Sequence, residues 1–147
     1  MIEKTIIIVD DQELFANGIK QLLEQDGDIF VEKIVNIGIN ALHSIENHKP
    51  DAILLDLNMP DKNGFEILDE IRDKFPKLPI CILSTYDSNA FIEKAKKLRA
   101  NAYFSKDASI DELRQFIFQN YTDKFLLSER IQKREQQTKT VFDNLYK

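Results

Sequence analysis

Short apolar runs alternate with amphipathic segments along most of this sequence, and this alternation restricts the folds open to the chain. Five runs are rich in β-branched or aliphatic residues and are short enough to be strands: Thr5–Val9, Phe30–Val35, Ala52–Leu55, Leu78–Leu83 and a weaker Ala102–Phe104. The segments between them carry apolar residues at helical spacing, such as Phe65, Leu68, Ile71 and Phe75. Strands that alternate with helices form right-handed βαβ units, which build a parallel sheet covered on both faces. The sequence therefore predicts an α/β fold with a doubly wound, five-stranded parallel sheet and five helices.

The polarity of the runs predicts their positions in the sheet. Thr5–Val9 and Ala52–Leu55 are almost wholly apolar, as strands buried on both faces are. The run Phe30–Val35 contains Glu32 and Lys33, which suits an edge strand. We therefore expect the first and third strands at the centre of the sheet and the second strand at its edge.

Charge and cysteine content narrow the settings in which the chain can act. The net charge of -5 repels the phosphates of nucleic acids and the surface of anionic membranes, so we expect this chain alone to bind neither. Cys81 is the only cysteine and lies in an apolar run, which favours a buried, inert thiol over a reactive one and fits a reducing compartment. The apolar run near the N-terminus is too short for a signal peptide or a membrane span. Together these features predict a cytoplasmic protein.

The composition changes after Tyr121. Residues 128–140 are nearly all polar, and apolar residues return only near the end of the sequence. A segment with this pattern cannot bury one helix face continuously. We therefore expect one domain over residues 1–121, followed over residues 122–147 by a polar linker or helical tail that is no complete second domain.

Polar residues follow the predicted strands at the point where each strand ends. In a parallel sheet the carboxyl ends of neighbouring strands lie at one edge, and ligands bind beyond that edge. The residues that the strand order places there are Asp10, Asp11, Asp56, Ser84, Thr85 and Lys106. The sequence therefore predicts that three carboxylates, two hydroxyl groups and one ammonium group converge.

Each of these residues also has an ordinary structural role open to it. Asp10 and Glu13 have the spacing of a helix capping box. Asp56 can begin a turn, and Lys106 can be a solvated side chain. Taken singly, each structural role is the better interpretation; it is the convergence of the residues that favours a site.

A cluster of carboxylates favours a bound cation, because neighbouring negative charges repel one another and raise their pKa values. Mg²⁺ prefers oxygen ligands, uses few carboxylates and commonly shares them with phosphate oxygens. The two histidines, His43 and His48, lie on a predicted polar helix away from this edge, and we interpret both as surface residues. We therefore expect Mg²⁺, rather than a softer metal, as the cofactor.

Four motifs stand in order along the chain: Val9-Asp10-Asp11, Leu54-Leu-Asp56-Leu-Asn-Met-Pro60 followed by Gly64, Ser84-Thr85, and Tyr103-Phe-Ser-Lys106. Their joint pattern resembles the receiver domain of two-component response regulators, and the resemblance covers residues 2 to about 120. It implies a flavodoxin-like fold whose strands lie in the order 2-1-3-4-5.

The resemblance also implies a role for each carboxylate. Asp56 would receive a phosphoryl group from a phosphohistidine on a sensor histidine kinase or a phosphotransfer protein. Asp10, Asp11 and Asp56 would hold Mg²⁺, with Asp10 acting partly through water. The backbone carbonyl of Asn58 would contribute a further ligand. Such a domain is a phosphoacceptor rather than an enzyme, with only weak self-phosphorylation and self-dephosphorylation expected.

A second set of roles concerns the response to phosphorylation. By the same resemblance, Ser84 and Lys106 would bind the phosphoryl oxygens. Inward movement of the Ser84 hydroxyl would leave room for Tyr103 to rotate from solvent into the sheet edge. A partner or a second copy of the chain would then dock on the altered surface.

Three positions depart from the pattern of the family. Thr85 stands where a small Ala or Gly is common and is expected to narrow access to the phosphoryl group. Arg99 replaces a frequent turn glycine, and Asp107 replaces a frequent proline after the lysine. The lifetime of the phosphorylated state and the local loop shape therefore do not follow from the resemblance.

The run Lys106-Asp-Ala-Ser-Ile-Asp-Glu-Leu113 is similar to that of receivers attached to LuxR-like helix-turn-helix transcription regulators. This similarity implies that phosphorylation controls a DNA-binding output through a homodimer. No helix-turn-helix segment follows in this sequence, so any contact with DNA would come from a domain that is absent from it.

Two other functions are compatible with parts of the pattern. One is a stand-alone receiver that acts only through protein contacts. The other is a phosphatase that forms an aspartyl-phosphate, but that class has a second aspartate two residues after the nucleophile, where this chain has Asn58. A dinucleotide-binding fold is excluded, because no glycine-rich fingerprint follows the first strand.

Overall fold

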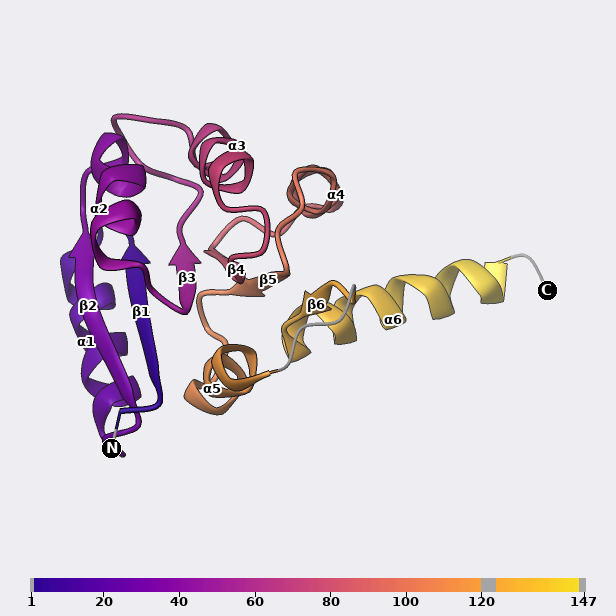
Figure 1. Ribbon diagram of the computed structural model, residues 1–147. Helices are drawn as coiled ribbons and strands as arrows, with labels where there is room; N and C mark the ends of the chain where they lie inside the picture. Colours follow the sequence, from indigo (N-terminus) through magenta and orange to yellow (C-terminus); the bar gives the residue numbers. More distant parts are fainter. Residues whose placement is uncertain (1, 120–123, 146–147) are drawn as a thin grey trace.

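A six-stranded parallel sheet flanked by helices makes up the computed structural model, which describes residues 2–119 and 124–145 (Figure 1). The strands are β1 (Lys4–Val9), β2 (Ile29–Val35), β3 (Ala52–Leu55), β4 (Ile80–Ser84), β5 (Ala102–Ser105) and β6 (Leu126–Leu127). The α-helices are α1 (Glu13–Glu24), α2 (Ala41–His48), α3 (Gly64–Lys74), α4 (Asn89–Lys97), α5 (Ile110–Phe118) and α6 (Glu129–Leu145), and a short 3₁₀-helix, η1, spans Gly38–Asn40.

The strand order is β2-β1-β3-β4-β5-β6. The predicted fold class and the order of the first five strands are confirmed, with β1 and β3 central and β2 at an edge. The predicted counts of five strands and five helices are wrong, because β6 pairs in parallel with β5 and α6 follows it. A strand of two residues has no period of its own to detect, since it is defined by its pairing with the edge of β5.

Alternate residues of each strand pack into two cores on opposite faces of the sheet. Ile7, Leu55 and Ile82 are buried on one face together with side chains of α2, α3 and α4. Ile8 and Leu54 are buried on the other face against α1 and α5. The strands are therefore covered on both sides, which explains why their sequences are continuously apolar.

The cysteine and the histidines lie where the sequence predicts. Cys81 is buried within β4, and burial raises the pKa of its thiol well above the ordinary value. A thiol in this environment stays protonated and poorly nucleophilic. His43 and His48 are exposed on α2, and His48 lies 3.2 Å from a carboxylate oxygen of Glu32.

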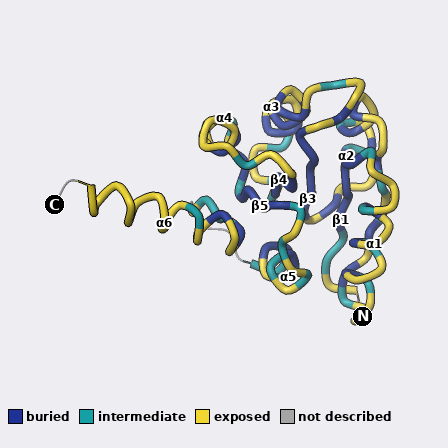
Figure 2. Tube along the Cα trace, turned by 180° about the vertical axis from the view of Figure 1, so that it is seen from behind, coloured by how far each residue is buried: buried dark blue, intermediate teal, exposed yellow. Residues whose placement is uncertain are grey.

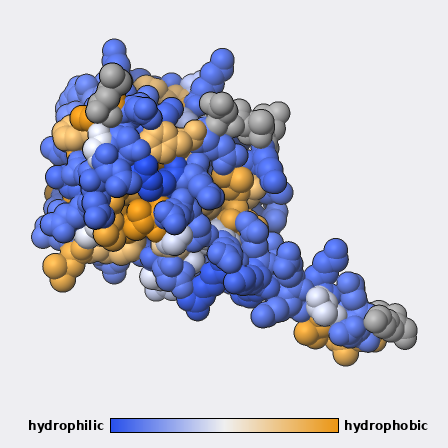
Figure 3. Space-filling view, turned by 90° about the horizontal axis from the view of Figure 1, so that it is seen from below, coloured by the Kyte–Doolittle hydropathy of each residue, from blue (hydrophilic) through white to orange (hydrophobic). Residues whose placement is uncertain are grey.

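The C-terminal helix begins against the body of the molecule and then extends away from it (Figures 1 and 2). In its first turn Ile131 is 1% exposed, whereas Val141, Phe142 and Leu145 are all exposed near its far end. Figure 3 shows apolar side chains gathered at that end of the projecting helix. Among the described residues, no helix combines the length and apolar character that a membrane crossing requires.

The turn after α4 holds a residue in an unfavourable conformation. Arg99 has a φ of 69°, in the left-handed region, and its carbonyl oxygen accepts a hydrogen bond from Nε of Arg72. A residue other than glycine is destabilised by roughly 1–2 kcal/mol in this backbone conformation. Glycine is frequent at this turn in the family that the sequence resembles.

Replacing this residue by glycine is expected to stabilise the protein. Arg99→Gly should raise the free energy of unfolding by about 1 kcal/mol, because the backbone strain is relieved. Urea unfolding of the variant and the wild type measures the difference. Lys97→Gly serves as the control, since glycine at this helical position should lower stability by roughly 0.5–1 kcal/mol. A less stable Arg99→Gly protein would contradict the strain argument.

Candidate functional site

The carboxyl ends of β1, β3, β4 and β5 carry the polar residues that the sequence predicts for this edge. Asp10 follows β1 directly, Asp56 follows β3, Ser84 is the last residue of β4, and Lys106 follows β5. The hydrogen bond from the Asp56 backbone N–H to the carbonyl of Val9 (2.9 Å) ties the ends of the two central strands together. The parallel register therefore brings residues from four strands to one place.

Three carboxylates form a cluster at this edge. Asp10, Asp11 and Asp56 each offer one oxygen, and these oxygens all lie within 4.8 Å of one another. Asp10 and Asp56 are buried, and Asp11 is half-buried. Burial raises the pKa of Asp10, with the charge of Asp56 adding to the rise and contacts with Lys106 and the Gln12 N–H opposing it. Such a cluster can hold a divalent cation, whose charge would offset the cost of burying the carboxylates.

Lys106 supplies the positive charge within the site. Its Nζ lies 2.9 Å from Oδ2 of Asp10 and 3.4 Å from Oδ2 of Asp56. It also donates to Oε1 of Gln12 at 2.5 Å and lies 4.6 Å from the centre of the Phe15 ring. Two carboxylates, one amide oxygen and one aromatic ring thus surround the ammonium group and fix its position in the site.

Gln12 and Phe15 are site residues that the sequence did not reveal. Neither belongs to the polar residues that the sequence predicts for this edge. Both lie at the start of α1, directly after the predicted Asp10-Asp11 pair. That proximity along the chain is the one signal that points to them. The capping box of Asp10 is not formed; Asp10 instead accepts a hydrogen bond from the N–H of Gln12 at 2.8 Å.

The loop after β3 fixes the position of the Asp56 carboxylate. Oδ1 of Asp56 accepts a hydrogen bond from the backbone N–H of Asn58 at 3.2 Å. The loop closes where the N–H of Gly64 donates to the carbonyl of Leu57 at 3.0 Å. A Cβ at Gly64 would lie 2.3 Å from the Leu57 Cα, so only glycine fits this approach. The role of the Asn58 carbonyl as a metal ligand stays a prediction.

Ser84 and Tyr103 are joined through a single residue of the loop between β4 and α4. The Ser84 hydroxyl oxygen accepts a hydrogen bond from the N–H of Tyr86 at 3.0 Å, and the hydroxyl of Tyr103 donates to the carbonyl of Tyr86. Tyr103 is fully buried, and burial raises its pKa to about 12, against the lowering effect of Ser84. The structure therefore holds Tyr103 at the inward end of the rotation that the resemblance implies.

Two of the three departures from the family pattern, Thr85 and Asp107, lie around the mouth of the site. Thr85 is exposed and lines a cavity of about 480 Å³ together with Ser84 and Lys106. Asp107 accepts a hydrogen bond from Oγ of Ser105 at 2.5 Å, and this contact, with a second from Arg130, lowers its pKa. Thr85 thus stands where it can restrict access, and Asp107 connects the loop after β5 to α6.

Comparison with known proteins gives a family match over most of the chain. A model of the response regulator receiver domain matches residues 6–118. The nitrate/nitrite response regulator protein NarL of Escherichia coli is 34% identical over 127 residues, which is 86% of this chain and 59% of NarL. The chain spans about half the length of the curated relatives it matches, 46% in the case of the DegU protein of Brevibacillus brevis.

Solved structures give the same result. A DNA-binding response regulator of the LuxR family from Staphylococcus aureus is 32% identical, with a TM-score of 0.72 over 78% of this chain and 95% of that one. A LuxR-family response regulator from Aurantimonas shares only 22% identity, which shows the fold alone. Its TM-score is 0.79 over 93% of this chain and 98% of that one, so the likeness reaches beyond the matched residues 6–118.

The buried charge of Asp10 gives a prediction for stability. In the presence of a chelator, Asp10→Asn should raise the melting temperature by roughly 3 °C, the shift expected for about 1 kcal/mol in a chain of this size, because a buried negative charge next to that of Asp56 is removed. Added Mg²⁺ should raise the melting temperature of the wild type and have less effect on the variant. Calorimetry with and without the ion measures both changes.

The matched control is Asp69→Asn, since Asp69 is exposed on α3 outside the carboxylate cluster. It should leave both melting temperatures within a degree of the wild type (about 0.5 kcal/mol or less). A lower melting temperature for Asp10→Asn in chelator would show that the contacts with Lys106 and Gln12 outweigh the cost of burial.

Proposed function

This chain belongs to the response regulator receiver domain family, and from that premise we propose that it accepts a phosphoryl group on Asp56 from a phosphohistidine of a sensor histidine kinase or phosphotransfer protein. The observation that carries the proposal is the position of this carboxylate. It is buried at the carboxyl edge of the sheet, within 4.8 Å of the oxygens of Asp10 and Asp11, and 3.4 Å from Lys106. A carboxylate in this setting is both a nucleophile and the centre of a charge-binding site.

The proposed reaction is an in-line displacement at phosphorus. A carboxylate oxygen of Asp56 forms a bond to the phosphorus as the phosphorus–nitrogen bond of the donor breaks, and the imidazole nitrogen leaves with the electron pair. Negative charge spreads over the phosphoryl oxygens in the transition state, so fixed positive charges do most of the work. Lys106 already lies at the cluster and needs little movement to meet those oxygens.

Mg²⁺ is the proposed cofactor, with Asp10, Asp11, Asp56 and the Asn58 carbonyl as its ligands. Bound there, it would neutralise charge on both the acceptor carboxylate and the phosphoryl oxygens. The oxygen-only donor set supports this choice over a softer metal. The raised pKa of Asp10 supports it as well, because it reports a negative charge that the protein alone stabilises poorly.

The proposed response runs from Ser84 to Tyr103. A phosphoryl oxygen on Asp56 would accept a hydrogen bond from the Ser84 hydroxyl and hold it inward. Since Ser84 and Tyr103 both bond to Tyr86, a shift of the serine is passed to the tyrosine through one residue. The phosphoryl group contacts Ser84 in one state only, which is the differential interaction that a population shift requires.

The proposed output is transcription control of the LuxR-like type, which the LuxR-family relatives support. Contact with DNA would require residues beyond this sequence, and a homodimer formed on phosphorylation is the proposed route to it. We propose a cytoplasmic location, and no activity beyond slow self-phosphorylation and self-dephosphorylation. A stand-alone receiver remains the second candidate, whereas the phosphatase is disfavoured by Asn58 at the position of the second acid.

Phosphorylation should be confined to Asp56. After incubation with acetyl phosphate and Mg²⁺, intact-mass measurement should show one phosphate adduct on the wild type and none on Asp56→Asn, because the amide is no nucleophile. Asp69→Asn, on the exposed side of α3, should carry the adduct like the wild type. An adduct that persists on Asp56→Asn would place the acceptor elsewhere.

The Tyr103 ring should respond to the phosphoryl mimic beryllofluoride only through Ser84. In the wild type, the mimic with Mg²⁺ should shift the ring signals of Tyr103 toward a single buried environment, because the serine hydroxyl is held inward. Ser84→Ala should bind the mimic and leave those signals unchanged. NMR of ring-labelled tyrosine measures both. Equal responses in the two proteins would remove Ser84 from the switch.

A further inference from the structure

The residues after α5 return to the sheet and dock beside the phosphoacceptor site. We call residues 124–145 the C-terminal segment. Its strand β6 pairs with β5: the N–H of Leu126 donates to the carbonyl of Asn101 at 3.0 Å, and the N–H of Ser128 donates to the carbonyl of Tyr103 at 3.3 Å. The Ser128 hydroxyl in turn accepts from the N–H of Ser105 at 3.1 Å. The segment is therefore bonded to the strand that carries Tyr103 and leads to Lys106.

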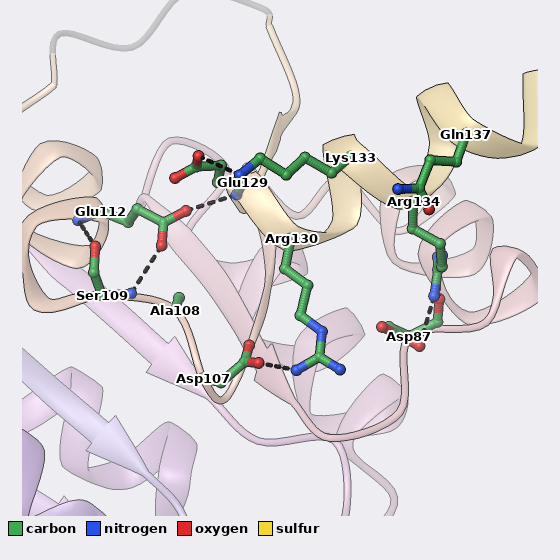
Figure 4. Close-up of a pocket in the computed structure, with 10 residues that line it drawn as sticks. All are labelled: Asp87, Asp107, Ala108, Ser109, Glu112, Glu129, Arg130, Lys133, Arg134 and Gln137. Carbon is green, nitrogen blue, oxygen red and sulfur yellow. Dashed lines mark hydrogen bonds and ion pairs between the residues drawn. The ribbon is translucent and has the colours of Figure 1, made fainter. Parts of the chain in front are cut away.

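Two arginines on the first turns of α6 reach the two loops that carry phosphoryl-site residues (Figure 4). Arg130 forms an ion pair with Asp107, the residue after Lys106. Arg134 lies 2.7 Å from Oδ1 of Asp87 and donates to its carbonyl oxygen at 2.7 Å. The two loops are thus tied to one helix across a polar cleft of about 740 Å³.

The segment also packs into the core that contains Tyr103. Ile131 is 1% exposed and belongs to the same core as Tyr103, which is fully buried, and Ile92 of α4. A tyrosine that rotates out to solvent must leave this core and open a cavity in it. Cavities of this kind destabilise a packed state by amounts that grow with their volume. The docked segment therefore favours the inward position of Tyr103.

Two paths, each made of neighbouring residues in a loop and their polar contacts, connect the phosphoacceptor edge to α6. One runs from Ser84 through Tyr86 to the adjacent Asp87 and on to Arg134. The other leaves Lys106 for its neighbour Asp107, which binds Ser105 and Arg130. A change at either phosphate-binding residue therefore acts on a loop that α6 contacts.

From these contacts we propose that the C-terminal segment is a latch that docks on the phosphorylated arrangement of the receiver and loosens when Tyr103 turns outward. The inference rests on the proposed phosphorylation of Asp56 and on the inward movement of Tyr103 that follows it. Docking and phosphorylation then favour each other, and thermodynamic linkage makes the effect reciprocal. Phosphorylation orders the segment, and the docked segment raises the affinity of the site for a phosphoryl group.

A charge-neutral substitution tests the latch. Ile131→Ala removes the buried side chain by which α6 packs into the core that contains Tyr103, and it leaves every charge in place. It should weaken the binding of beryllofluoride with Mg²⁺ by about five- to tenfold, near the lower end of usual coupling between sites. Val141→Ala is the matched control, because it makes a like truncation at the exposed far end of the same helix. It should bind the mimic as the wild type does.

Hydrogen exchange gives a second measurement on the same proteins. In the wild type, beryllofluoride should slow exchange of the Leu126 and Ser128 amides, the two that donate to β5. In Ile131→Ala this slowing should be largely lost, while the amides of β1 and β3 stay protected and show that the body is folded.

The double variant Arg130→Ala/Arg134→Ala should behave like Ile131→Ala in this measurement. The control Lys133→Ala/Lys139→Ala, which also removes two positive charges from α6, should behave like the wild type.

The outcomes separate the latch from the function on which it rests. If beryllofluoride fails to bind the wild type, or binds Asp56→Asn equally well, the proposed phosphoacceptor site is wrong. The latch, which rests on that site, is then wrong as well. If the wild type binds the mimic but Ile131→Ala binds it at least as tightly, only the latch is overturned. Faster exchange of the Leu126 and Ser128 amides on binding would also overturn it, because the segment would then be released instead of ordered.

Discussion

The contact between Lys106 and the buried carboxylates of Asp10 and Asp56 is the interaction on which the rest of the site depends. Burying like charges together is unfavourable, and the ammonium group compensates for only part of it, since the pKa of Asp10 remains raised. The protein thus maintains an excess of negative charge at the carboxyl edge of its parallel sheet. That excess favours a cation, and a cation bound beside the lysine would in turn favour the phosphoryl group that we propose for this site. The same parallel sheet that buries the carboxylates also holds the lysine opposite them.

Much of this arrangement follows from the sequence because it depends on local pattern and on one topological rule. Apolar runs locate β1, β3 and β4, and parallel pairing brings Asp10, Asp56 and Ser84 to the same edge. Side chains that complete the site from a neighbouring element are harder to foresee. Gln12 and Lys106 are 94 residues apart in the sequence, and no local pattern at either residue predicts their contact.

The C-terminal segment shows the limit of prediction most clearly. Its polar composition indicates a solvated helix, and most of α6 is one. Its two-residue strand and the buried Ile131 depend on an edge and a core that other parts of the chain supply. Likewise the partners of Arg130 and Arg134 are set by where two loops lie after folding. Local propensity carries no information on such contacts, so only the three-dimensional structure reveals them.

The pairing of β6 with β5 has a consequence for the solution behaviour of shorter versions of this receiver. Strands at the edge of a sheet present unpaired N–H and C=O groups, which invite another chain to add a strand. Here Leu126 and Leu127 occupy part of the β5 edge. A version of the chain that ends before β6 would leave that edge unpaired. Self-association of such a version would then arise from strand addition at the edge and not from phosphorylation. The strand β6 therefore covers part of an edge on which another chain could otherwise add a strand.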